Sequence, residues 1–442
     1  MTLMLSGAAF GQDWIETQRL TADEPAMEDV FGSAIDFDGE SIIVGVPNLD
    51  SDLENEGGAY VFVRDGEGWR RQAVLRSASP EIDGIFGSSV AIQGDLAVVG
   101  SILGDGIEVD SGTATVFRRS GDEWIAITTL SASDGETGAQ FGHSATIDHG
   151  TIAIGAVTDS DTGSVYVFEP DAGAWVESAK LQPISFPMTG SFGSSVAVSG
   201  EVLAVGATRS GTDDDRPGAV YVYERSDGNW IETVRLVGTG LQSGARFGWD
   251  VDIDADRIIA GGISAGRQQG KAFIFLNDGE MWQEETELIA PNTEGSTFGT
   301  VSIDGGIAVV GAQNFDLGAR ATGRAFIYQL RNGSWVLSDL INSSNPTEFA
   351  LFGNSVAVDG QTIVAAAALE SDDAFRAGAA YVFEPNPCLP DIDGDGSLTI
   401  FDFLAFQTAF DAGDPVADFD RDGDFTIFDF LAFQTAFDAG CP

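Results

Sequence analysis

Basic residues are scarce in this chain. Its 442 residues include 21 lysines and arginines against 69 aspartates and glutamates, which gives a formal net charge of −48. Proteins bind a phosphate backbone through Lys and Arg, which displace its counterions, so the composition argues against a nucleic-acid partner. It argues against anionic membrane surfaces for the same reason. The charge suits a secreted protein, or a surface that holds cations or cationic partners.

Long apolar runs are also missing. No segment is long and apolar enough to span a membrane as a helix. Residues 1–11 combine a short apolar stretch with small residues, which is typical of the end of a signal peptide, although they could instead be ordinary N-terminal chain. We expect a secreted protein, located outside a bacterium or on its surface.

Signatures of catalysis are few. The chain has two histidines, and it shows no nucleophile elbow, no histidine-rich metal motif and no phosphate-binding loop. Its carboxylates are so numerous that choosing an acid–base pair among them would be arbitrary. The sequence therefore predicts a protein that is not an enzyme. The alternative is a polysaccharide-degrading subunit.

Glycine, in contrast, is abundant, and part of it belongs to a repeat. The pair Phe-Gly recurs at spacings of 55, 55, 51, 55, 51 and 54 residues, and a Trp precedes each pair by 17 residues, or once by 16. The seven phenylalanines are Phe31, Phe86, Phe141, Phe192, Phe247, Phe298 and Phe352. Two landmarks that keep one period seven times indicate a repeat architecture. We expect the Phe to pack between neighbouring units and the Gly to allow the innermost strands to approach closely.

Each repeat contains four short strand patterns. In the fourth repeat these are residues 192–198, the continuously apolar 202–207, the alternating 219–224 and the half-polar 229–236. Tight turns join the first strand to the second and the third to the fourth. About fifty residues in four strands make one blade of a β-propeller. The sequence therefore predicts an all-β fold, a seven-bladed propeller of four-stranded blades.

The two ends of the repeat region predict how the ring closes. The first recognisable element, residues 14–20, matches the fourth strand of a repeat, whereas the last repeat stops after its third strand at 379–384. We therefore expect the N-terminal strand to complete the last blade and remove its open edge.

These repeats, with the pattern seen in "FGSSVAV", "LAVGA" and "GAVYVY", resemble the FG-GAP repeats of integrin α-subunits and of many secreted bacterial proteins. The resemblance covers residues 12–385 and implies a propeller that binds other molecules. Several integrin blades carry a calcium loop between their first two strands. Here those turns are minimal, and even residues 36–40 offer too few oxygens for calcium.

The residue after each Phe-Gly should lie near the central channel. Five of the seven are small or amide residues, whereas Trp249 and His143 break the pattern. A Trp at the mouth of a channel can stack on a sugar, so these two residues are candidates for a ligand face. The alternative is that Trp249 only fills space.

Long, acidic loops should share one face of the ring, between the second and third strands and between successive blades. Such loops on a rigid scaffold are a usual place for binding a glycan or a protein, although they could also be a solvated rim. Asp50, Asp52 and Glu54 alternate in one of them and could hold calcium weakly.

A Pro-rich linker, 386–390, precedes a small duplicated module at 391–442. Each copy begins with an EF-hand-like loop that has Gly at position six, and together the two loops predict two bound Ca²⁺ ions. The expected ligands in the first loop are Asp391, Asp393, Asp395, Ser397 (through its carbonyl), Thr399 and Asp402. The expected ligands in the second loop are Asp418, Asp420, Asp422, Asp424, Thr426 and Asp429.

One helix follows each calcium loop, and this arrangement resembles the dockerin module, which anchors secreted bacterial proteins to cohesin partners. Many dockerins have Ser-Thr at loop positions ten and eleven for this recognition, whereas this chain has Ile400-Phe401 and Ile427-Phe428. The resemblance implies a cohesin-like or other anchoring protein as partner, with an apolar contact surface.

The two helices of the module carry more phenylalanine than one buried stripe on each can hold, so we expect some of it to be exposed. The phenylalanines are Phe401, Phe403, Phe406, Phe410, Phe428, Phe430, Phe433 and Phe437. The two cysteines, Cys388 and Cys441, bracket the module, so an oxidising location predicts a disulfide between them. Two unrelated thiols are the alternative.

Together these patterns predict a secreted, non-catalytic binding or scaffold protein. Its propeller would present a recognition face, and its calcium-dependent, dockerin-like tail would attach it to a partner or to the cell surface. The alternatives are the polysaccharide-degrading subunit named above and a cell-surface adhesion protein.

Overall fold

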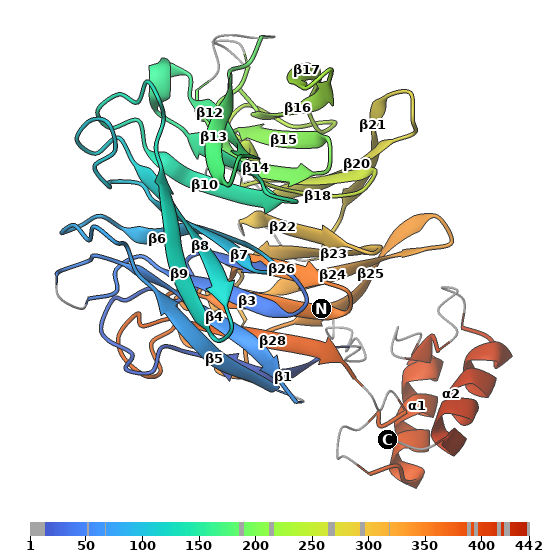
Figure 1. The fold of residues 1–442 in the computed structure, drawn as a ribbon. Coiled ribbons are helices and arrows are strands. Elements are labelled where there is room, and N and C mark those ends of the chain that lie inside the picture. Colours follow the sequence, from blue (N-terminus) through green and yellow to red (C-terminus); the bar gives the residue numbers. More distant parts are fainter. Residues whose placement is uncertain are drawn as a thin grey trace.

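The computed structural model describes residues 14–50, 53–66, 68–184, 190–211, 216–263, 270–291, 297–317, 319–386, 390–392, 397–412, 417–419 and 425–439. Seven four-stranded antiparallel sheets form a ring, and two helices follow them (Figure 1). The predicted all-β propeller with seven blades is therefore confirmed.

Blades one to four each take four consecutive strands, and the first strand of each blade is the innermost. Blade one contains β2 (Ile35–Phe37), β3 (Ser41–Val46), β4 (Gly58–Asp65) and β5 (Gly68–Leu75). Blade two contains β6 (Phe86–Gln93), β7 (Leu96–Ser101), β8 (Thr113–Ser120) and β9 (Glu123–Leu130). Blade three contains β10 (Phe141–Asp148), β11 (Thr151–Ala156), the 3-10 turn η1 (Asp159–Asp161), β12 (Ser164–Asp171) and β13 (Ala174–Leu181). Blade four contains β14 (Phe192–Ser199), β15 (Val202–Ala207), β16 (Ala219–Ser226) and β17 (Asn229–Leu236).

The remaining blades follow the same plan, apart from the outer strand of the last. Blade five contains β18 (Phe247–Asp254), β19 (Arg257–Gly262), β20 (Lys271–Asn277) and β21 (Trp282–Leu288). Blade six contains β22 (Phe298–Asp304), β23 (Ile307–Ala312), β24 (Ala325–Arg331) and β25 (Ser334–Ile341). Blade seven contains β26 (Phe352–Asp359), β27 (Thr362–Ala367), β28 (Ala379–Pro385) and, outermost, β1 (Trp14–Leu20).

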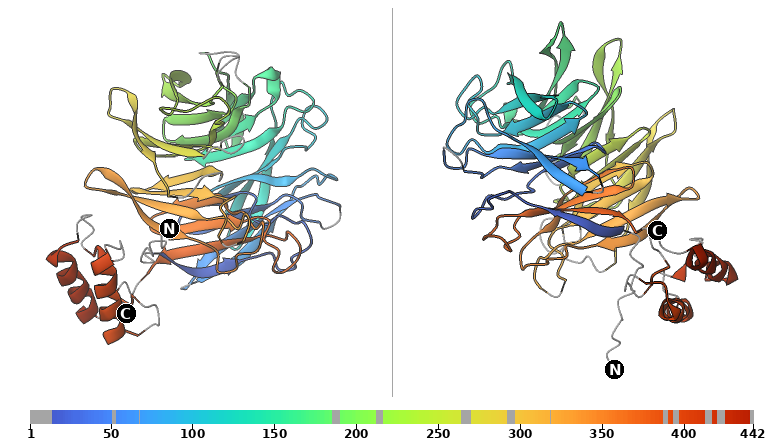
Figure 2. Two further views of the ribbon diagram at one scale, coloured as in Figure 1. Left: turned by 180° about the vertical axis from the view of Figure 1, so that it is seen from behind. Right: turned by 60° about the horizontal axis from the view of Figure 1, so that its bottom comes forward.

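The innermost strands form a closed circle. Each contacts the innermost strand of the next blade, and β26 of blade seven contacts β2 of blade one. Figure 2 shows the blades stacked around this circle from two further directions. Hydrogen bonds join the loops before the inner strands to those before the third strands, for example from Glu28 N–H to the Phe375 carbonyl. Both sets of loops therefore lie on one face, called here the loop face, and the short turns lie on the turn face.

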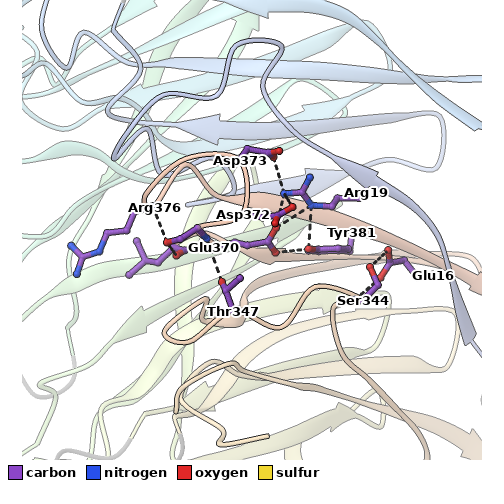
Figure 3. A network of polar contacts seen from close by, with 11 residues as sticks. Glu16, Arg19, Ser344, Thr347, Glu370, Asp372, Asp373, Arg376 and Tyr381 are labelled. Carbon is purple, nitrogen blue, oxygen red and sulfur yellow. Dashed lines mark hydrogen bonds and ion pairs between the residues drawn. The ribbon is translucent and has the colours of Figure 1, made fainter. Parts of the chain in front are cut away.

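The N-terminal strand closes the ring, as expected. β1 pairs antiparallel with β28, from Trp14 opposite Pro385 to Leu20 opposite Ala380. Polar contacts tie the same strand to blades six and seven (Figure 3): Ser344 Oγ donates to Glu16 Oε1 at 2.7 Å, and Arg19 binds Glu370. The first strand therefore completes the blade formed by the last three.

The repeated Phe lies in the interface between blades. Phe31 is fully buried among side chains of blade one and of blade seven, including Ala380 and Val382. Its ring also meets the ring of Tyr60 edge-on, with centroids 5.4 Å apart. Each interface thus buries aromatic and aliphatic surface from both blades, the dominant favourable contribution to folding.

Glycines set the spacing between blades. A Cβ atom on Gly45 in β3 would lie 2.2 Å from the Gly87 carbonyl oxygen in β6. The two strands could therefore not approach as closely if Gly45 had a side chain. Five further interfaces repeat this contact: Gly100 with Gly142, Gly155 with Gly193, Gly206 with Gly248, Gly261 with Gly299 and Gly311 with Gly353. The close approach is between an inner strand and the second strand of the preceding blade. It is not between innermost strands at the axis, as the sequence had suggested, because the atoms nearest to the Phe-Gly glycines belong to the second and third strands of the preceding blade.

Two helices of equal length follow the propeller, α1 (Ile400–Ala412) and α2 (Ile427–Ala439). They lie side by side beside the sheets in Figures 1 and 2. Within the described residues, no helix has both the length and the apolar character needed to cross a membrane.

Candidate binding sites in the channel and the C-terminal module

The inner strands surround a cavity of about 350 Å³. The residues that follow each Phe-Gly all line it: Ser33, Ser88, His143, Ser194, Trp249, Thr300 and Asn354. Its volume falls in the range of small-molecule sites, about 300–1,000 Å³. The sequence therefore placed these seven residues correctly.

Hydroxyl and amide groups on the cavity wall join one blade to the next. In most blades such a group donates a hydrogen bond to the carbonyl oxygen of the next Phe-Gly glycine. The pairs are Ser89 with Gly142 (2.8 Å), Ser144 with Gly193 (2.8 Å), Ser195 with Gly248 (3.1 Å), Thr300 with Gly353 (2.6 Å) and Asn354 with Gly32 (2.9 Å). These side chains hold the ring together, because each satisfies a backbone carbonyl at an interface.

Blade five departs from this pattern. Trp249 and Asp250 occupy the two places that are Ser-Ser in blades two and four. The Trp249 side chain is 39% exposed, even though it belongs to the innermost strand. An aromatic face of this size on a cavity wall can stack on a ring or attract a cation.

Three carboxylates also line the cavity. Asp250 Oδ2 accepts the Val301 N–H at 2.9 Å, and Asp252 Oδ2 accepts the Ile303 N–H at 2.9 Å. Asp36, in blade one, accepts the Ile92 N–H at 2.7 Å. Each carboxylate therefore bonds to the inner strand of the following blade.

Burial changes the acidity of these groups. It raises the pKa of Asp36 to about 7 and the pKa of Asp250 to about 7, and it raises the pKa of Asp252 as well. The negative charge of Asp252 adds to the rise at both of the other sites. Since blades one and five lie across the ring from each other, Asp36 lies on the opposite wall of the cavity from Asp250 and Asp252. Desolvation by the channel walls lowers the pKa of His143, although its side chain still meets solvent in the channel.

A second set of acidic residues lies where the inner strands end, at the turn face. Each accepts the N–H of the turn glycine in the next blade. The pairs are Asp38 with Gly94 (2.6 Å), Asp148 with Gly200 (2.6 Å), Asp254 with Gly305 (3.0 Å) and Asp304 with Gly360 (2.7 Å). These turn-face carboxylates therefore have a structural role, because each of them joins two neighbouring blades.

The acidic loops of the loop face are also organised by their own side chains. Asp50 Oδ1 accepts the Asn55 N–H at 2.7 Å, and Asp105 and Asp316 make the same bond to the residue five positions later. Asp50 therefore shapes its loop, and Asp52 lies outside the described residues.

In the C-terminal module, both helices begin with the same cap. Thr399 Oγ1 accepts the Phe401 N–H at 3.1 Å, while Asp402 Oδ2 accepts the Thr399 N–H at 2.8 Å. Thr426 and Asp429 repeat both bonds with the same distances. This reciprocal arrangement is a capping box, which satisfies two N–H groups at a helix start.

The expected calcium ligands fall partly within the described residues. Asp402 and Asp429 are fully buried at loop position twelve, and the donors at the described positions are oxygens, which suits a hard cation such as Ca²⁺. Asp391, Ser397, Thr399, Asp418 and Thr426 are described too. The other expected ligands, and both cysteines, lie outside the described residues: Asp393, Asp395, Asp420, Asp422, Asp424, Cys388 and Cys441.

Most of the module's phenylalanines form its core. The rings of Phe406 and Phe433 stack with centroids 4.2 Å apart and planes 9° apart, and both residues are fully buried. The rings of Phe403 and Phe430 meet edge-on beside this pair. The core is thus built from equivalent residues of the two copies.

Equivalent residues of the two copies are also exposed. Phe401 is 63% exposed and Phe428 is 62% exposed. Ile400, Leu404, Ile427 and Leu431 complete this set of exposed apolar side chains, called here the apolar patch. Two of the eight phenylalanines are thus mainly exposed, as was expected for some of them, and the other six pack in the core of the module. Exposed apolar side chains of this kind are typical of interaction surfaces.

The channel carboxylates were missed by the sequence reasoning. The signal was present: at three and five residues after the repeated Phe, blades two, four and seven have Ser and Ala, whereas blade five has Asp250 and Asp252. Comparing the repeats position by position would have found them.

Comparison with protein families matches the FG-GAP repeat at residues 14–62, 69–117, 124–168, 175–223 and 335–383, more than half of the chain. Among solved structures, a chain of the "Crystal Structure of Mitotic Checkpoint Complex" is similar, with a TM-score of 0.52 and 12% identity. The match covers 87% of this chain and 98% of that chain, and at this identity it shows the fold alone. No curated protein matches.

Proposed function

The chain belongs to the FG-GAP repeat family, and we propose that it is a secreted binding or scaffold protein, not an enzyme. In this proposal the propeller recognises a ligand, and the C-terminal module, folded around two Ca²⁺ ions, attaches the protein to a partner. The partner is an anchoring protein with an apolar contact surface, outside the cell or on its surface.

The propeller suits a recognition role because it is rigid and carries long loops on one face. The ring is closed by β1, and hydrogen bonds cross the blade interfaces, so the loops project from a fixed scaffold. Rigid elements that position variable loops are the usual architecture of binding proteins. The propeller fold is consistent with a binding or adhesion role.

The observation that carries the anchoring role is the apolar patch. Its two halves come from equivalent positions of α1 and α2, so they present the same side chains twice. In a dockerin, loop positions ten and eleven contact the partner, and here these positions are Ile400-Phe401 and Ile427-Phe428. Leaving six apolar side chains in water is unfavourable unless a partner covers them.

Calcium would act through the loops that precede the helices. Asp402 and Asp429 are buried where each loop meets its helix, and each also closes the capping box. A cation held in the loop would therefore fix the start of the helix that carries Phe401 or Phe428. Metal binding would then be coupled to folding of the patch.

The anchoring role can be tested with the full chain. We expect it to capture a specific secreted protein in calcium and to release it in EGTA. The double variant Phe401→Ser/Phe428→Ser should lose capture, because it removes the two largest exposed side chains of the patch. The matched control is Gln407→Ser/Gln434→Ser, which changes exposed helix residues outside the patch and should retain capture. Equal capture by both double variants would reject the patch as the anchoring surface.

A further inference from the structure

The channel of the propeller holds more negative charge than the fold needs. Asp36, Asp250 and Asp252 each accept a backbone N–H from the next blade on Oδ2 and the N–H of their own following residue on Oδ1. Elsewhere in the ring a serine makes the same kind of bond: Ser355 Oγ accepts the Ile35 N–H at 3.1 Å, and Ser302 Oγ accepts the Val358 N–H at 3.1 Å. A neutral hydroxyl is therefore sufficient to join two blades at this depth.

The charge also has a cost. Burying a carboxylate without a cation is unfavourable, which is why the pKa values of these aspartates are raised. The cavity wall, all of it within the described residues, contains no Lys or Arg to compensate. A positively charged ligand would supply what the wall lacks.

A single metal ion is a poor fit to these carboxylates. In the described part of the chain, no three acidic, histidine or cysteine side chains come close enough together to hold a metal. Asp36 lies in blade one, whereas Asp250 and Asp252 lie in blade five, so the negative charges are spread across the cavity. Separated charges on opposite walls suit an extended ligand with more than one positive group.

The exposed ring of Trp249 adds a second kind of recognition. It replaces a small hydroxyl residue of the repeat, and it brings the indole, the best side chain for attracting a cation to its face, to the cavity wall. Burial keeps the pKa of His143 below its usual value, so this side chain is neutral at neutral pH and does not repel a cation.

We propose that the central channel binds a small aliphatic polyamine, with its ammonium groups on Asp36, Asp250 and Asp252 and its methylene chain or one ammonium group against Trp249. The inference rests on the proposed role of the propeller as the ligand-binding part of the chain. A neutral sugar would also stack on Trp249, but it would leave the carboxylates without a counter-charge. A cavity of about 350 Å³ has room for a ligand of this size.

Isothermal titration of the full chain in calcium and 150 mM salt tests this proposal. We expect spermidine to bind at one saturable site, and cellobiose not to bind there. The key variant is Trp249→Ser/Asp250→Ser/Asp252→Ala, which gives blade five the residues that blade four has at these places, so the fold should be kept. It should weaken spermidine binding at least about tenfold.

The matched control is Asp148→Ser, which removes a turn-face carboxylate outside the cavity at a place where blade four already has Ser199. Binding should be unchanged in this variant. Equal binding by the triple variant, or loss in both variants, would mean that spermidine only coats an acidic surface, and the proposal would be rejected. Tighter binding of a Lys-Lys dipeptide than of spermidine would indicate that the channel binds lysine side chains of a protein. It would then reject a free polyamine as the ligand. Capture of the anchoring partner does not involve the channel, so the two proposals can fail separately.

Discussion

Arg19, in the first strand of the chain, forms an ion pair with Glu370, in the last loop of the propeller. Arg19 Nη2 lies 2.6 Å from Glu370 Oε1, and the Glu370 side chain is fully buried. Tyr381 also donates a hydrogen bond to this carboxylate, and Arg19 Nη2 binds Asp373 at 2.8 Å. The contact joins residues 351 positions apart, and so it fastens the strand that closes the ring.

We expect Arg19→Met to lower the free energy of unfolding by about 2 kcal/mol at neutral pH, because it leaves a buried carboxylate without its cation. Urea denaturation measures this loss. Arg70→Met is the matched control: Arg70 lies in another outer strand, and its ion pairs with Asp65 and Asp122 are exposed, so its loss should cost less than about 0.5 kcal/mol. Equal effects would show that Glu370 does not depend on Arg19.

The glycine contacts between blades predict a larger effect. A Cβ on Gly155 would lie 2.1 Å from the Gly193 carbonyl oxygen, so Gly155→Ala should push two blades apart and cost about 3 kcal/mol. Gly121→Ala is the control, because a Cβ there meets nothing and only the positive φ of 66° opposes it, at a cost of about 1 kcal/mol. Thermal melting of the two variants compares these costs. Similar melting temperatures would contradict the close packing.

The channel carboxylates predict how stability depends on pH. The folded pKa of Asp36 is about 7, above the unfolded value of about 3.9, so the folded state holds the extra proton between these limits. The stabilisation that the Asp36 carboxyl contributes is therefore fully present below about pH 4 and is lost as the pH rises toward 7. We expect Asp36→Ala, which introduces the residue that blades two, four and seven have there, to reduce the difference in stability between pH 5 and pH 7.5 by about 2 kcal/mol. Urea titrations at the two pH values measure it.

Asp148, at the turn face, should behave in the opposite way. Burial raises its pKa, but the Gly200 N–H, Gln93 and His149 outweigh burial and hold the pKa below its usual value. Its contribution to stability is thus present above the unfolded pKa and is lost as the pH falls below it. Asp148→Ser should leave the difference in unfolding free energy between pH 5 and pH 7.5 equal to that of the wild-type protein. If Asp148→Ser altered this free-energy difference as much as Asp36→Ala does, the pH dependence could not be assigned to the channel carboxylates.

Removal of calcium should affect the two parts of the chain differently. In EGTA we expect α1 and α2 to unfold while the propeller keeps its melting temperature, because its blades are held by backbone and apolar contacts. Limited proteolysis would detect rapid cleavage in residues 397–439 under these conditions. Asp402→Ala should reproduce this sensitivity in calcium, because it removes a buried carboxylate and the helix cap, whereas Asp411→Ala, an exposed change in the same helix, should not. Unchanged protection of the module in EGTA would argue against calcium-dependent folding.

The fold was readable from the sequence because it is repeated. The number of blades follows from a Phe-Gly pair and a Trp that keep one spacing seven times. The outer-strand pattern at residues 14–20, which comes before the first full repeat, predicts the pairing of β1 with β28 that closes the ring. These signals are the alternation of apolar and polar residues within a strand and the constant spacing of the repeats, and both depend little on the rest of the chain.

The candidate sites were only partly readable. Trp249 and His143 stood out in the sequence because they break a column of small residues. Asp36, Asp250 and Asp252 also break the repeat, but only the folded ring shows that they line one cavity. Likewise, composition predicted exposed phenylalanine in the C-terminal module but could not say that Phe401 and Phe428 are the two.

The sequence by itself thus determined the number of blades, the way the ring closes and the duplication of the C-terminal module, because each is encoded in residues close together or at a constant period. Only the tertiary structure decided which side chains share an environment. Burial, the pKa of a carboxylate and the exposure of an aromatic ring depend on neighbours hundreds of residues away, and closing the ring is what brings those neighbours together.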